Sequence, residues 1–426
     1  MAGSEGGQPP EVARCYPEQY NTLLADKVGR FESRLVTAAA QPLPETEVFT
    51  SEPLNFRMRA TFAMWREGDE VHYVMYNKRK DDEPSDSEKA SDGEVAVPFT
   101  QSADGAVQES APPKKPMRPA GRGPPHEVPT YPMGSLRINE LMPLVRAELL
   151  GVEELRTKIN DVRFLTTQSG DALISITYNR PIDPEVWSSA AEGLIVALGG
   201  GVRIVGRSRK VKVVVGGETV SETLNVPHGR GACHYTQAEG AFTQPNAGVC
   251  EKMLGWAFDV TRGSDGSDLC ELYCGNGCFT IAIAPNFRQV IATELSKASV
   301  ELAEANIARN ALGNVRVARL SAEEFSEAHS GVRRFHRLAE ANITLGKGSG
   351  LEFSTLLVDP PRAGLDEVCV GLARGFERIV YVSCNPDTLV RDVMALRDTH
   401  SVARVAAFDQ FPYTDHLECG VVLERR

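Results

Sequence analysis

The amino-acid sequence predicts an α/β fold: a doubly wound, mostly parallel sheet in the C-terminal part, preceded by an N-terminal α+β unit. Three observations support this prediction. The chain has 426 residues with 42% apolar content, enough for more than one hydrophobic core, since single cores rarely exceed ~250 to 300 residues. Strand-like and helix-like segments alternate after residue 265, the order that builds parallel βαβ units. The first of these strands ends in a glycine turn at 272–277, where such sheets bind nucleotides.

The N-terminal part starts with a segment, 1–15, that is rich in glycine, proline and glutamate and is expected to be a flexible tail. Apolar residues then recur at helical spacing between 20 and 35, which predicts a first helix. The segment 55–77 alternates in polarity on both sides of Glu-Gly-Asp-Glu, and this pattern predicts an antiparallel hairpin.

Residues 80–126 interrupt the pattern. They are first acidic and then basic and rich in proline, a composition that buries too little apolar area to pack. We predict a disordered insertion in a surface loop. The alternative interpretation is a basic arm that contacts RNA.

Helical and strand-like segments resume between 137 and 217. Because they do not follow βαβ order, we predict that residues 16–230 form one α+β domain. Its last strands carry five basic residues and no acid: Arg203, Arg207, Arg209, Lys210 and Lys212. One interpretation is that these charges keep an exposed sheet edge from pairing with strands of other molecules. The alternative is that they contact phosphates of a nucleic acid.

The C-terminal part alternates strands and helices in regular order. Strands are predicted at 268–274, 289–295, 315–320, 354–361, 378–386, 402–411 and 419–425, and helices at 297–311, 321–330 and 365–376. Ligands are therefore expected at the carboxyl ends of the parallel strands. Residues 231–426 are predicted to form this nucleotide-type domain.

Three cysteines surround the glycine turn at a spacing of four: Cys270, Cys274 and Cys278. This spacing raises the hypothesis that the three cysteines bind an iron-sulfur cluster or a metal ion. However, Cys270 falls within a predicted strand, so the three thiols would not converge on one metal. The nearby sequence also lacks the fourth ligand that a closed zinc site needs. We predict packing thiols and neither metal nor cluster.

The glycine turn favours a nucleoside-like ligand. Gly275 and Gly277 permit a tight turn and let the backbone approach a ligand closely. Glu294 ends the next strand, where a carboxylate can accept hydrogen bonds from both ribose hydroxyls of a nucleoside. The alternative is that Glu294 is an exposed acid at a strand end without a ligand. Thr280 replaces the third glycine of the dinucleotide fingerprint, which favours a ligand such as S-adenosylmethionine over NAD.

Two further strand ends carry reactive residues. Asp359 precedes two prolines, which fix a rigid turn and leave its carboxylate facing the expected ligand. Cys384 ends a neighbouring strand and precedes Pro386, where a helix starts whose amides favour a thiolate. A buried structural cysteine is the alternative, but this position predicts a nucleophile.

Composition excludes several classes of protein. No apolar run approaches the ~20 residues that span a bilayer, and the N-terminus does not resemble a signal peptide. Nine cysteines, an odd number, fit a reducing compartment. The net charge of -11 argues against indiscriminate binding of polyanions. We expect a cytoplasmic or organellar protein without disulfides.

Five motifs stand in the order found in one protein family. They are FTQPN (242–246), LYCGNG (272–277), DPPRAGLD (359–366), YVSCNPDTL (381–389) and FDQFPYTDHLECG (408–420). With FRMRA at 56–60, the chain resembles the uracil-C5 RNA methyltransferase family, most closely its bacterial-type tRNA branch. The likeness runs from about residue 16 to the end, except for 80–126.

This resemblance implies a Rossmann-like class I methyltransferase domain at 231–426, an RNA-binding N-terminal domain, S-adenosylmethionine as methyl donor and tRNA as partner. Cys384 matches the family's nucleophile and Glu418 its base. The family's cofactor contacts match Gln244, Tyr273, Glu294 and Asp359. The tRNA branch has GNGNF where this chain reads GNGCF, so we expect Cys278 to weaken cofactor binding.

The implied reaction is methylation of C5 of a uridine in the tRNA T-loop, in which Cys384 adds to C6 and Glu418 later removes the C5 proton. A second interpretation is methylation of ribosomal RNA, although those branches often carry an N-terminal β-barrel and a four-cysteine cluster that this sequence does not show. A third is a role in RNA folding alongside catalysis. A NAD-dependent oxidoreductase is opposed by Thr280.

Overall fold

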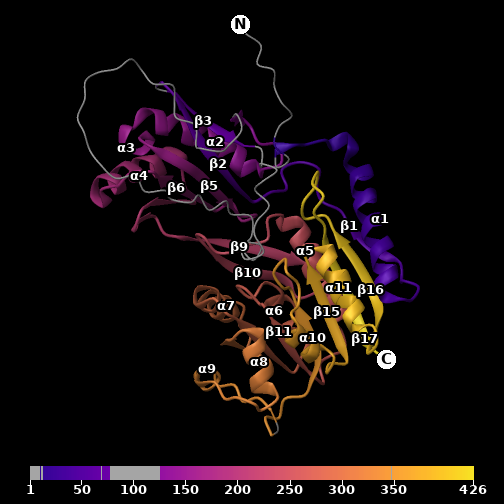
Figure 1. Ribbon diagram of the computed structural model, residues 1–426. Helices are drawn as coiled ribbons and strands as arrows, with labels where there is room; N and C mark the ends of the chain where they lie inside the picture. Colours follow the sequence, from indigo (N-terminus) through magenta and orange to yellow (C-terminus); the bar gives the residue numbers. More distant parts are fainter. Residues whose placement is uncertain (1–9, 11–12, 69, 77–124, 347) are drawn as a thin grey trace, which may run out of the picture.

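The structure is a computed structural model, and it describes residues 10, 13–68, 70–76, 125–346 and 348–426. An eight-stranded sheet and a seven-stranded sheet dominate these residues, and a two-stranded ribbon runs between them (Figure 1). The predicted tail at 1–15 and the predicted insertion at 80–126 fall outside the described residues, except at their last positions.

The eight-stranded sheet has the strand order β1-β16-β17-β15-β14-β11-β12-β13. Its strands are β1 (Thr46–Phe49), β11 (Asp268–Leu272), β12 (Gln289–Glu294), β13 (Val315–Arg319), β14 (Phe353–Val358), β15 (Arg378–Ser383), β16 (His400–Phe408) and β17 (Glu418–Arg425). Strands β11 to β15 run parallel, and β17 is antiparallel to both of its neighbours. The predicted doubly wound, mostly parallel sheet is confirmed.

Helices cover both faces of this sheet (Figure 1). They are α5 (Ala247–Val260), α6 (Cys278–Ile283), α7 (Lys297–Arg309), α8 (Ala322–His329), α9 (His336–Glu340), α10 (Glu367–Ala373) and α11 (Pro386–Leu396), with a 3-10 turn at Ala284–Asn286. On β11, Leu269 packs in the cluster that includes α5, α6 and α7, whereas Cys270 packs in the cluster that includes α8, α10 and α11. Successive strand residues point to opposite faces, so strands covered on both sides are almost wholly apolar.

The first helix and the first strand join the C-terminal sheet. After a 3-10 turn at Pro17–Gln19, α1 (Tyr20–Ala39) packs against α11, and β1 pairs in parallel with β16 (Figure 1). The predicted helix is therefore present. Both elements lie within the predicted domain 16–230, but β1 belongs to the eight-stranded sheet and α1 packs beside it. The pairing of β1 with β16 could not be predicted, because the two strands are far apart in the sequence and no local pattern links them.

The seven-stranded sheet has the order β4-β3-β2-β5-β6-β7-β8. Its strands are β2 (Arg59–Glu67), β3 (Glu70–Met75), β4 (His126–Glu127), β5 (Ile159–Thr166), β6 (Ala172–Tyr178), β7 (Val202–Ser208) and β8 (Val211–Val215), and its helices are α2 (Leu136–Gly151), α3 (Glu153–Arg156) and α4 (Pro184–Leu198). The β2–β3 hairpin matches the predicted one. Trp187 of α4 lies so close to Gly206 of β7 that a Cβ there would come within 2.6 Å of the indole.

The basic segment of the sequence forms β7, β8 and the turn between them. Among the described strands β8 is an edge of its sheet, as the charge pattern indicated. Three of the five basic residues pair with acids of the protein itself: Arg203 with Asp171, Arg207 with Glu239 and Lys212 with Glu218. Arg209 and Lys210 are exposed at the turn between the two strands.

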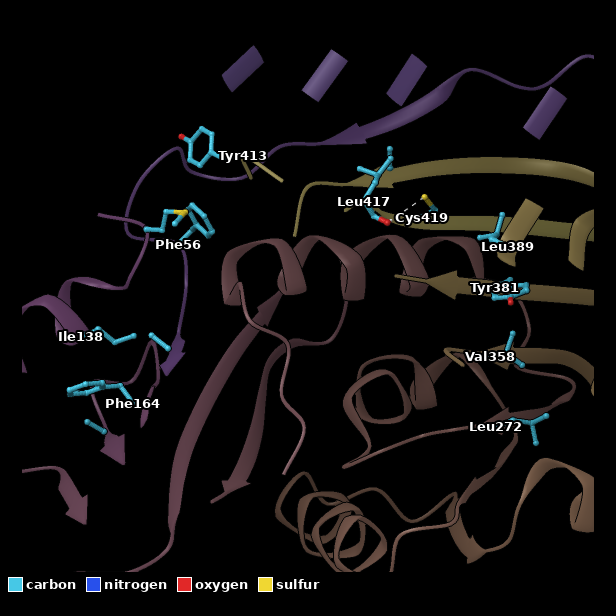
Figure 2. Close-up of a cluster of buried hydrophobic side chains, with 14 of the residues drawn as sticks. Phe56, Ile138, Phe164, Leu272, Val358, Tyr381, Leu389, Tyr413, Leu417 and Cys419 are labelled. Carbon is cyan, nitrogen blue, oxygen red and sulfur yellow. Dashed lines mark hydrogen bonds between the residues drawn. The ribbon is translucent and has the colours of Figure 1, made fainter. Parts of the chain in front are cut away.

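The ribbon of β9 (Thr219–Val226) and β10 (Gly231–Ala238) leads from the seven-stranded sheet to α5. One hydrophobic cluster extends through both sheets, from Phe164 past Phe56 and Tyr413 to Tyr381 and Leu272 (Figure 2). Among the described helices, none is both long enough and apolar enough to cross a membrane.

Candidate active site

Three of the predicted residues lie at one edge of the eight-stranded sheet. Tyr273 follows β11, Glu294 ends β12 and Asp359 follows β14. Because β11 lies between β12 and β14 and all three strands are parallel, these residues occupy adjacent carboxyl ends. This is the edge at which open α/β sheets bind their ligands.

The glycine turn at this edge is held by Glu294. Gly275 and Gly277 have φ of +56° and +83°, left-handed conformations that glycine adopts without strain. The backbone N–H of Gly275 donates to Oε2 of Glu294 at 3.1 Å, and that of Ser296 donates to Oε1 at 2.7 Å. These two amides orient the carboxylate. Each of its oxygens keeps a further lone pair, so it can still accept hydrogen bonds from the hydroxyls of a ribose.

Tyr273 stands at a backbone position that few residues tolerate. Its φ is +62°, the left-handed region that non-glycine residues rarely adopt. The hydroxyl lies 3.3 Å from Sγ of Cys369 on α10, and burial raises the pKa of Tyr273. The phenol is therefore neutral, and its backbone strain is of the kind that clusters at ligand sites.

Gln244 lies in the turn that precedes α5. Gln410, which is fully buried, donates through Nε2 to Oε1 of Gln244 at 3.3 Å. The carbonyl of the same Gln410 side chain accepts from the backbone N–H of Asn246 at 3.2 Å, and Asn246 in turn caps α5 by accepting from Val249 N at 3.1 Å. The fourth expected cofactor contact is thus oriented by the segment that follows β16.

Cys384 and Glu418 are brought together by strand register. In the antiparallel pair of β15 and β17, Ser383 is opposite Cys419. Cys384 follows Ser383 and Glu418 precedes Cys419, so the two residues adjoin the same end of this strand pair. Burial raises the pKa of the Cys419 thiol well above its usual value, and the nearby charges of Glu418 and Cys384 raise it further. Glu418 is only 2% exposed, whereas Cys384 is partly exposed.

The start of α11 lies directly after Cys384. Asn385 caps this helix by accepting from Asp387 N at 3.1 Å, and Pro386 is its first residue. The amide of Asn385 also donates to the carbonyl of Arg362 at 2.9 Å, which joins the turn after β14 to the turn after β15. A helix thus starts at Pro386, where the sequence predicted one. The positive end of a helix stabilises a nearby thiolate.

The three cysteines near the glycine turn occupy different surroundings. Cys270 is buried within β11, and Cys274 is buried at the turn. Sγ of Cys278 lies 3.7 Å from Sγ of Cys250 on α5. Within the described ranges, no group of three or more histidine, cysteine or acidic side chains is arranged to hold a metal ion.

Two residues at this edge were not singled out from the sequence. Gln410 lies in the quoted motif FDQFP, where a polar residue between two phenylalanines after a strand was an available signal. Arg362 follows the two prolines after Asp359, and its Nε is buried without a hydrogen-bond partner among the described groups. Only the fold reveals that the side chain of Gln410 and the Nε of Arg362 are buried.

The carboxyl of Glu271, beneath the glycine turn, is expected to make stability depend on pH. Burial, with a contribution from Asp359, raises the pKa of Glu271 to about 8. The folded state therefore holds this proton more tightly than the unfolded state, whose pKa is near 4.5, and stability falls as pH rises from about 5 to 8. Glu271→Gln should flatten that part of the curve of melting temperature against pH. The exposed Glu301→Gln is the control, and equal slopes in both variants would contradict the prediction.

Known proteins resemble this chain over almost its whole length. The family profile described as tRNA (Uracil-5-)-methyltransferase matches residues 19–92 and 121–426. A tRNA/tmRNA (uracil-C(5))-methyltransferase of Azoarcus sp. is 43% identical over 414 residues, which cover 97% of this chain and 99% of that protein. The protein of the same name from Ectopseudomonas mendocina is 44% identical over 410 residues, 96% of this chain and 98% of that protein.

A solved structure has the same fold. The Pyrococcus abyssi tRNA (uracil-54, C5)-methyltransferase in complex with S-adenosyl-L-homocysteine superposes with a TM-score of 0.61 at 19% sequence identity, covering 95% of this chain and 83% of that one. At this level of identity the likeness concerns the fold alone. The family match and the full-length relatives go further: this chain belongs to the tRNA (uracil-5-)-methyltransferase family.

Proposed function

We propose that this protein methylates C5 of a uridine in the T-loop of tRNA through a covalent bond between Cys384 and C6 of the base. The observation that supports the proposal is the register of β15 and β17: Ser383, the residue before Cys384, is opposite Cys419, the residue after Glu418, at the same sheet edge as the glycine turn. Because relatives are named for both tRNA and tmRNA, the proposed substrates also include tmRNA.

The chemistry needs a nucleophile and a base at one point. C5 of uracil is a poor nucleophile, and addition of the Cys384 thiolate to C6 turns the ring into an enolate with carbanion character at C5. S-adenosylmethionine supplies the electrophilic methyl group. The carboxylate of Glu418 then takes the C5 proton, the C6–S bond breaks, and the C5=C6 double bond is restored.

The residues at the sheet edge fit an adenosine-like methyl donor. Glu294 would accept from the ribose, and the left-handed glycines would let the backbone approach the ligand. Tyr273, Asp359 and Gln244 are the other proposed contacts. Because the thiol of Cys278 faces Cys250, it would offer this ligand little polar contact.

The target base must leave its stack before it can reach Cys384, which requires a few kcal/mol. The proposed support for the unstacked base is an exposed aromatic side chain near Gln244 in the sequence. Phe242, two residues before Gln244, is 48% exposed, and the guanidinium of Arg59 lies 5.2 Å from its ring centroid. Stacking on such a side chain stabilises an unstacked base by about 1 to 3 kcal/mol.

Methylation assays with defined transcripts test the proposal. Purified protein, S-adenosylmethionine with a labelled methyl group and a tRNA transcript should give 5-methyluridine, identified by mass spectrometry of nucleosides. Changing T-loop uridines singly to cytidine should abolish product at one position only. Ribosomal RNA transcripts are the comparison, and methylation of these but not of tRNA would favour the ribosomal interpretation instead.

A further inference from the structure

We infer that Lys27 is a positioning residue for the removal of the C5 proton: from α1 it holds the segment 409–417, which connects β16 to β17 and leads directly into Glu418. This inference rests on the proposed function above. Lys27 lies far from Glu418 in the sequence, and α1 stands beside α11 and β16 in the fold (Figure 1). Nothing in the chemistry of the reaction requires a lysine on that helix.

The ammonium group of Lys27 uses all three of its donors on this segment. Nζ lies 2.5 Å from Oδ1 of Asp409, 3.2 Å from the carbonyl of Phe411 and 3.2 Å from the carbonyl of His416. An ammonium has three N–H groups and no acceptor, so its hydrogen bonding is complete. The contacts reach both the beginning and the end of the segment, which fixes the path of the chain up to the residue before Leu417.

This lysine is not needed to attach the helix. Lys27 and Asp409 are 4% and 1% exposed, and taking two charges out of water offsets much of their attraction, so a buried ion pair is weak evidence for stability. The apolar residues Leu24, Phe31 and Leu35 already bury α1 in the core. A buried pair of this kind is better explained by the geometry that it imposes.

The same segment also orients the expected cofactor contact. Asp409 N donates to the carbonyl of Phe49 at 3.0 Å, so the segment is tied to β1 as well as to α1. The next residue, Gln410, holds Gln244 and Asn246. A displaced segment would therefore disturb Glu418 at one end and Gln244 near the other.

Removing the lysine should slow one step more than the others. In Lys27→Met, the carbonyls of Phe411 and His416 lose their donor and Asp409 is left buried without its cation, which destabilises the protein. In the double variant Lys27→Met/Asp409→Asn neither charge of the pair remains, so stability should recover while the segment still lacks the three contacts of Lys27. A purely structural lysine would give a fully active double variant.

The experiment compares methyl transfer with proton release in single turnovers. Transfer is measured with a labelled methyl donor, and proton release with tRNA carrying tritium at C5 of its uridines. S-adenosylmethionine is kept at a saturating concentration, so that a weakened contact at Gln244 does not limit the rate. In both Lys27 variants, tritium release should then fall about tenfold or more while methyl transfer changes less than threefold, and a protein–RNA adduct stable in SDS should accumulate. Arg30→Met is the matched control, because it removes only an exposed ion pair of α1 with Asp415 of the same segment.

Three outcomes decide against the inference or against its basis. A folded double variant with the wild-type ratio of the two rates would overturn it. Loss of the melting transition in both Lys27 variants would mean that the lysine serves the fold, which also overturns it. If instead the wild-type protein methylates tRNA but Cys384→Ala does so equally well, the covalent mechanism itself is wrong, whatever Lys27 does.

Discussion

Glu418→Gln is expected to leave methylated RNA covalently attached to the protein. Glutamine has nearly the same shape as glutamate but does not accept the C5 proton, so methyl transfer proceeds and elimination stalls. Turnover should fall about 10² to 10⁴-fold, the usual contribution of a general base. The adduct should appear as a slow band in SDS electrophoresis that carries both the labelled methyl group and the RNA.

Cys384→Ala completes this test, because it removes the sulfur atom that forms the proposed bond to C6. It should bind tRNA and S-adenosylhomocysteine normally, form no adduct, and lose activity by about 10⁴-fold or more, as expected when a nucleophile is removed. The double variant with Glu418→Gln should show no slow band. An adduct that persists without Cys384, or normal turnover by Glu418→Gln, would refute the assigned roles.

Glu294→Ala is expected to weaken binding of the cofactor about a hundredfold. Hydrogen bonds to a charged group contribute about 1.5 to 3 kcal/mol each, and the loss of about 3 kcal/mol corresponds to two orders of magnitude in the dissociation constant. The variant also removes the acceptor of Gly275 N, so the glycine turn loses part of its orientation. Calorimetric titration with S-adenosylhomocysteine measures the effect.

Two matched variants sharpen this measurement. Glu301→Ala removes an exposed carboxylate of α7, whose contact with Lys297 is 3.5 Å, and should leave the dissociation constant unchanged. Glu294→Gln keeps one acceptor oxygen, so its dissociation constant for S-adenosylhomocysteine should lie between those of the wild type and Glu294→Ala. A dissociation constant for Glu294→Ala within threefold of wild type would mean that the ligand does not contact this carboxylate.

The fold of the C-terminal part was predictable because its signals are local. Strands such as β14 are mostly apolar and are followed by turns with glycine or proline, and the helices between them have amphipathic spacing. The pairing of β1 with β16 was not predictable. It joins residues from opposite ends of the chain, and no short window of sequence contains both strands.

Burial explains what the sequence could and could not indicate about the site. Asp359, Cys384 and Glu294 stand at strand ends, and that position can be inferred from the order of strands and turns. Lys27 looks like a surface lysine, since its neighbours in the sequence include Asp26 and Gly29, and only tertiary packing buries it. The five basic residues near β8 illustrate the opposite case, because three of them are neutralised by acids that no sequence pattern links to them.

The place of β1 in the sheet bears on how the protein is made. Synthesis proceeds from the N-terminus, so α1 and β1 leave the ribosome long before β16 exists to receive them, and the sheet is complete only when almost the whole chain has emerged. Contacts between such distant residues form slowly, and an unpaired strand edge invites association with other chains in the meantime. A fragment that starts at residue 231 lacks β1, so the edge of β16 that pairs with β1 would stay unpaired. We therefore expect a fragment of residues 231–426 to aggregate.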